Sequence, residues 1–371
     1  MTLISIWSSR ITAKKIYRAG IIGCGRIGSL LEKDPLREKP CTHAGAYHKH
    51  ERVELVAGCD INKERLEEFK ADWKVESLYE DYGKLLSETK LDIVSIATEI
   101  SNHPEIVIEA ARNAVPVIVC EKPIAPGLEI AREMVKECEK MGSFLLINHE
   151  RRFASDYAFV KGMIERGDIG ELVSIRGRML TGSPKDGTDC EVEGGGPLLH
   201  DGTHLIDVIR YLSGSEVDWV YGDMSEKPGI RVEETLWGMM GLKSGVRVMI
   251  EAGGRRNYFV FEVELEGTEG KISIGNGLLK WWRTRKSKLY SGFYDLVEED
   301  IPQFDMSPQF SNEVEAVIRY LDEGTLPGSS GWDGYHALEA IYALYESAIK
   351  KKVLVVPPVG VDFTPLKGYF S

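Results

Sequence analysis

The 371-residue sequence has no apolar run that approaches the roughly 20 residues needed to cross a membrane. Its six cysteines include no C-x-x-C pair, which argues against a zinc ribbon or a thioredoxin-type redox motif. The chain also has no N-x-S/T acceptor for N-glycosylation. These absences predict reduced thiols in a cytoplasmic protein.

Basic residues are fewer than acidic ones, with 46 Lys and Arg against 58 Asp and Glu, which gives a formal net charge of −12. An acidic surface repels phosphate backbones and anionic lipids, so we expect neither a nucleic-acid nor a membrane partner. Residues 1–15 lack a basic segment followed by a long apolar stretch, and we expect a loose extension there rather than a signal peptide. The remainder, 43% hydrophobic and 28% charged, indicates a folded globular protein.

The pattern of apolar residues changes near residue 150. Before that point, short apolar runs alternate with helical patterns, the clearest of which ends at Gly142. This alternation predicts a doubly wound α/β domain over residues 1–150, with a parallel sheet covered on both faces. The expected strands are Ile16–Ile22, Val53–Cys59, Asp92–Ala97, Val117–Cys120 and Ser143–Asn148.

Residues 151–371 predict an α+β domain, because their apolar runs alternate side to side and are bounded by glycines, which is typical of antiparallel strands. These runs are Leu172–Met179, Gly245–Ala252 and Phe259–Glu266. The expected helices are His200–Leu212 closed by Gly214, a stripe from Val314 to Leu321 closed by Gly324, and a last helix with Asp333 as candidate N-cap. A cleft between the two domains is the default ligand site.

The strongest local signal is GCGRIG at residues 23–28, directly after the first expected strand. G-x-G-x-x-G also occurs in ordinary turns, but here Asp60 ends the next strand, as in dinucleotide-binding domains. Gly23 would allow a tight turn, Gly25 the approach of a pyrophosphate, and Gly28 the packing of a helix whose N-terminus faces the phosphates. Asp60 would bind the ribose hydroxyls and repel a 2′-phosphate, which favours NAD over NADP.

One departure concerns the interval between Gly28 and Asp60, which is 32 residues against the usual 20 or so. The excess falls in a polar, proline-containing stretch, Leu31–Thr42. This stretch is either a lid over the cofactor or a surface insertion. The tolerance of folds for long loops favours the insertion.

Polar residues also follow the third and fourth expected strands, at the edge where open parallel sheets bind ligands. Lys122 of the run EKP would point into the cleft there, although a surface lysine before a proline is the competing interpretation. Ala97 and Thr98 precede His103, which either contacts the cofactor region or simply packs against it. Arg151 and Arg152 come after the fifth strand, and they could contact a substrate or lock the domains together.

The segment GGGPLLHDGTHLID at residues 194–207 carries three glycines that permit close approach to a ligand. His200 and His204 are four residues apart, on one face if the helix begins early enough, and Asp207 could orient the His204 ring. No third metal ligand is evident, so no metal is expected. The basic, aromatic run 280–283 is either a surface that binds a sugar ring or an edge strand whose charges prevent it from pairing with another chain.

In order and spacing, these motifs resemble the Gfo/Idh/MocA family of sugar and polyol oxidoreductases. The resemblance covers the chain from residue 16 onward. It implies an N-terminal Rossmann domain, a C-terminal domain with a large, mostly antiparallel sheet, and a homodimer or homotetramer formed through that sheet. The matching segments are GCGRIG at 23–28, CD at 59–60, SIAT at 95–98, His103, EKP at 121–123, RRF at 151–153, residues 194–207 and WDGYHALEAIYALYESA at 332–348.

The resemblance also implies residue roles. Lys122 and His204 would be the catalytic pair, and family members usually carry an Asp four residues before that His. Here His200 stands at that position with Asp201 beside it, so either could fill the third role. The implied substrate contacts are Lys122, Arg152, His200, Asp201 and His204. The implied NAD contacts are Gly23, Gly25, Arg26, Ile27, Gly28, Asp60, Ala97, Thr98, His103, Glu121 and Lys122.

The expected activity is hydride transfer between NAD and a secondary alcohol of a sugar or polyol. His204 would take the hydroxyl proton while the Lys122 ammonium stabilises the alkoxide. Two alternatives are known within the family. One is an NAD-dependent glycosidase that oxidises its sugar transiently, and the other is a non-catalytic sugar or dinucleotide sensor. The retained Lys122 and His204 argue against the sensor.

Overall fold

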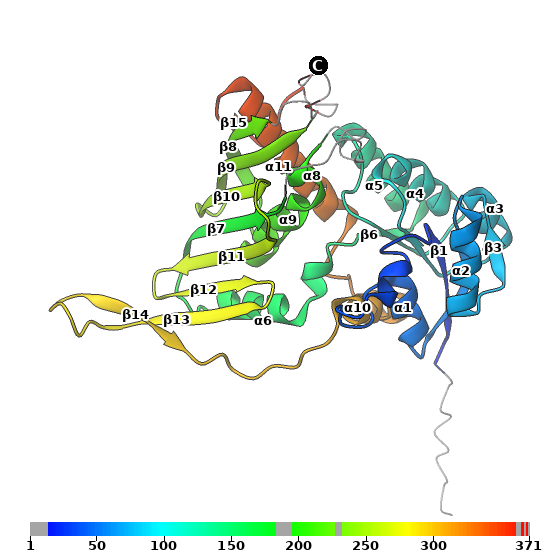
Figure 1. Cartoon of the computed structure of the whole chain (residues 1–371), viewed down its shortest axis with the longest axis horizontal. Coiled ribbons are helices and arrows are strands. Elements are labelled where there is room, and N and C mark those ends of the chain that lie inside the picture. The colour runs from blue at the N-terminus through cyan, green and yellow to red at the C-terminus, as the bar shows by residue number, and fades with distance from the viewer. Residues whose placement is uncertain (1–13, 183–194, 227–231, 361–364, 367–368, 370–371) are drawn as a thin grey trace, which may run out of the picture.

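The computed structural model describes residues 14–182, 195–226, 232–360, 365–366 and 369. Nearly all of the expected N-terminal extension, together with Cys190 and Gly194, lies outside this part of the chain. The described residues form two sheets, each with its own helices, which lie side by side (Figure 1). The five cysteines within them are all free thiols.

The first sheet is parallel and six-stranded, with the order β3-β2-β1-β4-β5-β6, which confirms the predicted doubly wound architecture. All five expected strands are present, and the short β3 is an addition. The strands are β1 (Tyr17–Ile22), β2 (Val53–Cys59), β3 (Ser77–Tyr79), β4 (Ile93–Ile96), β5 (Val117–Cys120) and β6 (Phe144–Ile147).

Helices cover both faces of this sheet because alternate strand residues point to opposite sides and both sets are apolar. One face packs against α1 (His43–Lys49), α2 (Lys63–Trp73) and, from much later in the chain, α10 (Gln309–Glu323). The other face packs against α3 (Tyr82–Glu88), α4 (His103–Arg112) and α5 (Leu128–Met141). The predicted C-cap Gly142 is confirmed, with φ of 77°.

The connection after the glycine turn is interrupted, as the long interval between Gly28 and Asp60 indicated. The chain makes a 3₁₀ turn, η1 (Leu30–Lys33), and the α-helix α1 begins only at His43. The backbone N–H groups of His43 and Ala44 donate to the carbonyls of Ile27 and Gly28, at 3.2 and 3.0 Å. Helix α1 therefore packs directly on the end of the glycine turn. The residues between η1 and α1 form a loop that separates the two helical segments.

The second sheet has nine strands in the order β14-β13-β12-β11-β7-β10-β9-β8-β15. All neighbouring pairs are antiparallel except β7 with β10, in agreement with the mostly antiparallel prediction. The strands are β7 (Leu172–Leu180), β8 (Val217–Glu226), β9 (Glu233–Leu242), β10 (Arg247–Gly253), β11 (Val260–Gly267), β12 (Gly270–Gly275), β13 (Leu278–Lys286), β14 (Tyr294–Glu299) and β15 (Leu354–Val355).

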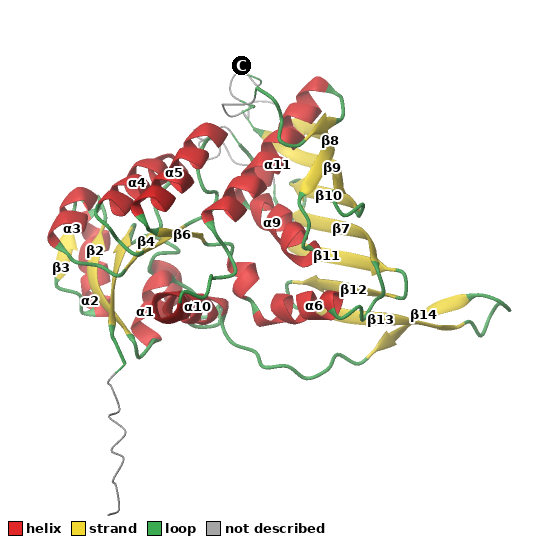
Figure 2. Cartoon of the chain, turned by 180° about the vertical axis from the view of Figure 1, so that it is seen from behind, coloured by secondary structure: helices red, strands yellow, loops and turns green. Residues whose placement is uncertain are grey.

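Helices lie against one face of the nine-stranded sheet (Figure 2). They are α6 (Ser155–Glu165), α9 (Gly202–Ser213) and α11 (Gly331–Lys350). The expected helix over His200–Leu212 is divided, because α8 (Pro197–His200) ends before Asp201 and α9 starts after it.

Two predicted helix ends are confirmed and one is corrected. Gly214 closes α9 and Gly324 closes α10, with φ of 62° and 75°. Helix α11 is capped by Ser330 rather than by Asp333, which occupies the third helical position and whose carboxylate accepts a hydrogen bond from the Ser330 N–H. The spacing S-x-x-D matches a capping box, and it places the cap three residues earlier than predicted.

The basic, aromatic run forms the start of β13, next to the edge strand β14, and this pair extends away from the rest of the molecule (Figure 1). Lys280 pairs with Glu298 across the two strands at 3.2 Å, and Trp281 packs against the core. This arrangement fits the charge-guarded edge better than a sugar platform.

Candidate active site

A cavity of about 560 Å³ opens at the carboxyl ends of β1, β2 and β4, where the strand order reverses. Its lining includes seven of the predicted cofactor residues. These are Gly23, Gly25, Arg26, Ile27, Asp60, Ala97 and Thr98. Arg65 and Tyr82 also line the cavity, and sequence reasoning missed them because they sit on α2 and α3 rather than in a recognisable motif.

The three glycines of the turn meet different surroundings. Gly23 has φ of 97°, and a Cβ there would overlap the carbonyl oxygen of Ala97. A Cβ at Gly28 would overlap the carbonyl oxygen of Gly23, so this position holds the turn closed. At Gly25 the nearest atom would be an Arg65 nitrogen at 3.8 Å, which leaves open space over the backbone. This is the cradle that a pyrophosphate requires, and the residues present fit a dinucleotide.

Asp60 lies at the end of β2 with 7% of its surface exposed. One carboxylate oxygen accepts a hydrogen bond from the Cys24 N–H at 3.0 Å, and the other accepts from Asn62 N–H at 2.9 Å. The Arg65 guanidinium is 3.8 Å away. These contacts fix the carboxylate beside the cavity, with lone pairs left for ribose hydroxyls.

His103 does not line this cavity; its ring connects two loops at the sheet edge. Its two nitrogens lie 3.1 Å from the carbonyl oxygen of Thr98 and 3.0 Å from that of Pro123. Burial lowers the pKa of His103, which favours the neutral ring. The residue therefore ties the loop after β4 to the loop that carries Lys122.

Lys122 follows β5 and reaches the helical layer of the second sheet. Its Nζ donates to the carbonyl oxygen of His200 at 3.0 Å, at the end of α8. His204 lies one turn into α9 and is influenced by the charge of Lys122. The structure thus brings together the two residues predicted to act as a pair, although 82 positions separate them in the sequence.

His204 is half-buried, and its surroundings favour the neutral ring. Burial, with smaller contributions from Lys122, Arg151 and His149, lowers its pKa well below the ordinary value. Its Nδ1 is buried and has no hydrogen-bond partner among the described residues. The Asp201 side chain is exposed, and Asp207, expected to orient His204, instead accepts two hydrogen bonds from Arg152.

Glu121 is the centre of a buried polar chain beneath the sheet edge. Its carboxylate lies 3.0 Å from His43 Nε2 and accepts from the Asn148 amide at 2.6 Å. Burial opposes its ionisation, but His43, Lys122 and Asn148 outweigh it and hold the Glu121 pKa below its ordinary value. His43 and the buried Glu313 nearby were not predicted, since neither stands in a motif.

Glu233 fixes the glycine-rich turn that precedes the two histidines. Its carboxylate accepts from the backbone N–H groups of Gly196 and Leu198, both at 2.9 Å, and from the Tyr345 hydroxyl at 2.9 Å. Burial raises the pKa of Glu233 to about 7, although these hydrogen bonds act to lower the pKa. A single carboxylate thereby holds α8 against β9 and α11.

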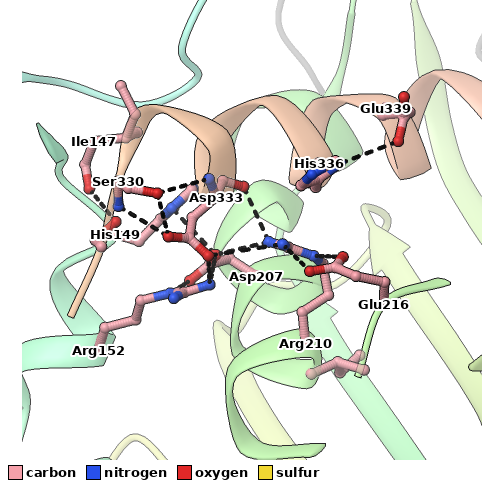
Figure 3. Close-up of polar contacts among 12 residues, drawn as sticks. Ile147, His149, Arg152, Asp207, Arg210, Glu216, Ser330, Asp333, His336 and Glu339 are labelled. Atoms are coloured by element: carbon pink, nitrogen blue, oxygen red, sulfur yellow. Dashed lines mark hydrogen bonds and ion pairs between the residues drawn. The ribbon is translucent and has the colours of Figure 1, made fainter. Parts of the chain in front are cut away.

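The two arginines after β6 have separate partners. Arg152 donates to both oxygens of Asp207 at 2.8 Å, contacts Asp333 at 3.0 Å, and donates to the Gly328 carbonyl (Figure 3). Arg151 lies over the Phe261 ring, 3.6 Å from its centre, and its charge acts on His204. Arg152 was one of the predicted substrate contacts, and that role stays a prediction; in the structure its guanidinium joins η3 (Glu150–Phe153) to α9 and α11.

The looped-out residues after the glycine turn line a second cavity of about 300 Å³, away from Asp60. Arg37 and Glu38 face Arg151 and Asp156 across it, and the segment before α10 completes the wall. The insertion is thus part of the boundary between the two sheets, and it does not line the cavity beside Asp60.

Within the described residues, no cluster of three His, Cys, Asp or Glu side chains is arranged to hold a metal ion. In the same part of the chain, no helix is long and apolar enough to span a bilayer.

A glycine-turn cavity with an acid at the end of the second strand, at the sheet edge from which Lys122 also emerges, is typical of a dinucleotide-dependent oxidoreductase. Two family models match the chain. Residues 17–149 match "Oxidoreductase family, NAD-binding Rossmann fold", and residues 157–273 match the "GFO/IDH/MocA C-terminal domain". The chain belongs to the Gfo/Idh/MocA oxidoreductase family, and its N-terminal domain binds NAD.

Curated relatives align along nearly the whole chain. Myo-inositol 2-dehydrogenase of Thermotoga maritima is 28% identical, with 90% of this chain and 97% of the relative covered. D-apiose dehydrogenase of Paraburkholderia graminis is 27% identical, with coverage of 92% and 90%.

Among solved structures, a probable dehydrogenase from Thermotoga maritima has a TM-score of 0.75 at 26% identity, with 91% of this chain and 98% of that chain covered. Levoglucosan dehydrogenase in complex with NADH and L-sorbose has a TM-score of 0.78 at 22% identity, with coverage of 93% and 100%, and shows the shared fold.

Proposed function

We propose that this oxidoreductase transfers a hydride between NAD and a secondary alcohol of a sugar or polyol, with Lys122 and His204 as the acid/base pair. The observation that carries the proposal is the convergence of these residues, from the end of β5 and from α9, through the contact of Lys122 with the His200 carbonyl. The names of the relatives, an inositol and an apiose dehydrogenase, support this substrate class.

His204 begins the reaction as a neutral base. Its lowered pKa keeps the imidazole unprotonated at neutral pH, so a ring nitrogen can accept the proton of a bound hydroxyl. The Lys122 ammonium stabilises the negative charge that develops on the substrate oxygen and polarises the carbonyl in the reverse direction. When bound, the nicotinamide supplies the chemistry of hydride acceptance or donation.

Substrate positioning involves both domains in this proposal. Arg151 is the arginine beside His204, and His200 holds Lys122 through its main-chain carbonyl. We place the domain boundary near residue 150, between β6 and η3, so the substrate lies at the junction.

The direct test is a screen of sugars, inositols and sugar acids that follows NADH absorbance with purified protein. Alcohol-dependent formation of NADH is the expected result. Release of an aglycone without net NADH would identify the transient-oxidation glycosidase instead. Saturable sugar binding with no turnover across the panel would indicate a sensor.

Cofactor preference follows from the Asp60 carboxylate, which we propose selects NAD over NADP. Asp60→Asn keeps an acceptor for the Cys24 N–H but removes the charge that repels a 2′-phosphate. We expect the ratio of kcat/KM for NAD to that for NADP to fall at least about tenfold, because a hydrogen bond to a charged group contributes about 1.5–3 kcal/mol. Wild-type protein that prefers NADP would contradict the assignment.

The glycine turn offers a matched pair of variants for separating cofactor binding from stability. Gly25→Ala meets open space, so it should keep the melting temperature while weakening NAD binding about tenfold or more. Gly28→Ala forces a Cβ onto the Gly23 carbonyl and should lower the free energy of unfolding by about 1–3 kcal/mol. Calorimetric titration and thermal melts measure the two effects. Equal NAD affinity for Gly25→Ala and wild type would argue against a pyrophosphate at this turn.

We also propose that the protein forms a homodimer or homotetramer in the cytoplasm. Helices cover one face of the nine-stranded sheet (Figure 2). Trp237, Met239 and Met249, which alternate with core residues on β9 and β10, are each about half exposed. Met239 and Met249 are direct neighbours on paired strands, which makes the apolar patch continuous. A second copy packed on this face would bury it.

A further inference from the structure

His204 lacks the orienting partner that a catalytic base usually has. Bases that remove a proton from a hydroxyl commonly have their second ring nitrogen held by a third group, which fixes the tautomer. Here Nδ1 of His204 is buried and makes no hydrogen bond to any residue that the structure describes. Asp201 extends into solvent, and Asp207 is held by Arg152. The group that would orient His204 must therefore come from elsewhere in the site.

His149 is the polar side chain packed against that ring. It follows β6 and is 1% exposed, and its ring meets the His204 ring edge to face, with centroids 6.5 Å apart and planes at 74°. On its other side, Nδ1 of His149 lies 3.2 Å from Oδ1 of Asp207. The two atoms are within hydrogen-bond distance, although Nδ1 forms no hydrogen bond within the described residues of this structure.

Asp207 is a firm anchor for such a ring. Arg152 grips both of its oxygens at 2.8 Å, and Arg210 approaches at 3.4 Å from the next turn of α9 (Figure 3). Arg152 in turn contacts Asp333 in the capping box of α11. The carboxylate cannot turn toward His204 without losing the bidentate pair, so its influence on that ring has to pass through His149.

We propose that His149 is a positioning residue for the reaction, linking the anchored Asp207 carboxylate to the His204 ring and fixing the tautomer whose Nε2 faces the substrate alcohol. The inference rests on the proposed role of His204. A neutral imidazole has one donor and one acceptor nitrogen. With Nδ1–H directed at Asp207, Nε2 of His149 accepts from Nδ1–H of His204, after the closer approach that substrate binding provides or through one water.

The protonation states agree with this arrangement. Burial lowers the pKa of His149 to about 4 despite the opposing charge of Asp207, so the ring stays neutral and keeps its acceptor. The other charges facing His149 are those of Arg152, Arg210 and Asp333. Those facing His204 are Lys122 and Arg151. The variants below leave all of these other groups in place.

The test compares His149→Phe with His149→Gln in the full-length enzyme, once an alcohol substrate has been found. Phe keeps a ring but has no acceptor, whereas the Gln amide oxygen can accept the hydrogen bond. We expect Phe to lower kcat about 10- to 100-fold with little change in KM, and Gln to recover most of it. Because an acceptor stabilises the imidazolium of His204, its loss should also move the acidic limb of the kcat profile to lower pH.

The matched control is His336→Phe on α11, where the ring nitrogen also lies 3.2 Å from a carboxylate, that of Glu339 (Figure 3). It should change neither kcat nor its pH profile. If His149→Phe keeps wild-type kcat, or lowers it equally at all pH values without recovery in Gln, the positioning role is wrong. If His204→Asn retains full activity, the proposed role of His204 is wrong as well. This result distinguishes failure of the proposed function from failure of the His149 proposal alone.

Discussion

Lys122→Met is expected to lower kcat about 10²–10⁴-fold while NAD binding stays within a few-fold of wild type. The substitution removes the ammonium that stabilises charge on the substrate oxygen in a site where water does not replace it. Methionine has similar length and no charge, so packing beside α8 is preserved. The rate is measured with saturating NAD and alcohol, and cofactor affinity by titration of protein fluorescence.

Lys161→Met is the matched control for that variant. Lys161 is also partly buried and also donates to a main-chain carbonyl, that of Tyr211 at 2.9 Å, but it lies on α6 away from the paired residues. Its loss should leave kcat within about twofold of wild type. Comparable loss of activity in both variants would mean that Lys122 acts through structure and not through its charge.

His204→Asn should have an effect of similar size for a different reason. Asparagine cannot accept a proton at neutral pH, so the alcohol must lose its proton to water, and kcat should fall about 10²–10⁴-fold. The lowered pKa of the wild-type ring gives the sign of the pH dependence: activity should stay level as pH falls from neutral and decline only when the imidazole becomes protonated.

The pH profile distinguishes a lost base from a damaged site. In His204→Asn the rate should rise with pH, since hydroxide increasingly replaces the missing base. His50→Asn, at a partly exposed histidine that contacts Glu315, is the control and should retain the wild-type profile. A level profile in His204→Asn at near wild-type rate would remove His204 from the reaction.

The parallel sheet and its cofactor edge were predictable because the signals are local. Each strand is a short apolar run, and topology places the carboxyl ends of neighbouring strands together, which locates Asp60 and Lys122 without any knowledge of contacts. The glycine turn was predictable for the same reason, because the residues that allow its tight backbone are close together in the sequence. The antiparallel strands of the second sheet followed from their alternation.

The rest depends on contacts between distant residues. Helix α1 packs on the glycine turn because the N–H groups of His43 and Ala44 donate to carbonyls of that turn across the inserted segment. No periodicity in the sequence predicts these contacts. The partner of Asp207 lies 55 positions earlier in the chain. Asp207 is three residues from His204 and seven from His200, so several pairings are possible, and only the folded chain selects among them.

The charged cluster of Arg152, Asp207 and Asp333 makes the second domain a rigid support. Arg152 follows the domain boundary and joins Asp207 on α9 to Asp333 on α11, and both the arginine and Asp207 are almost wholly shielded from water. Pulling these elements apart would separate the charges, at a cost of about 3–5 kcal/mol. At any instant, α9 would have parted from α11 in only about one molecule in several hundred to several thousand. The helix that carries His204 is thereby fixed to its neighbours and cannot shift alone when a ligand binds.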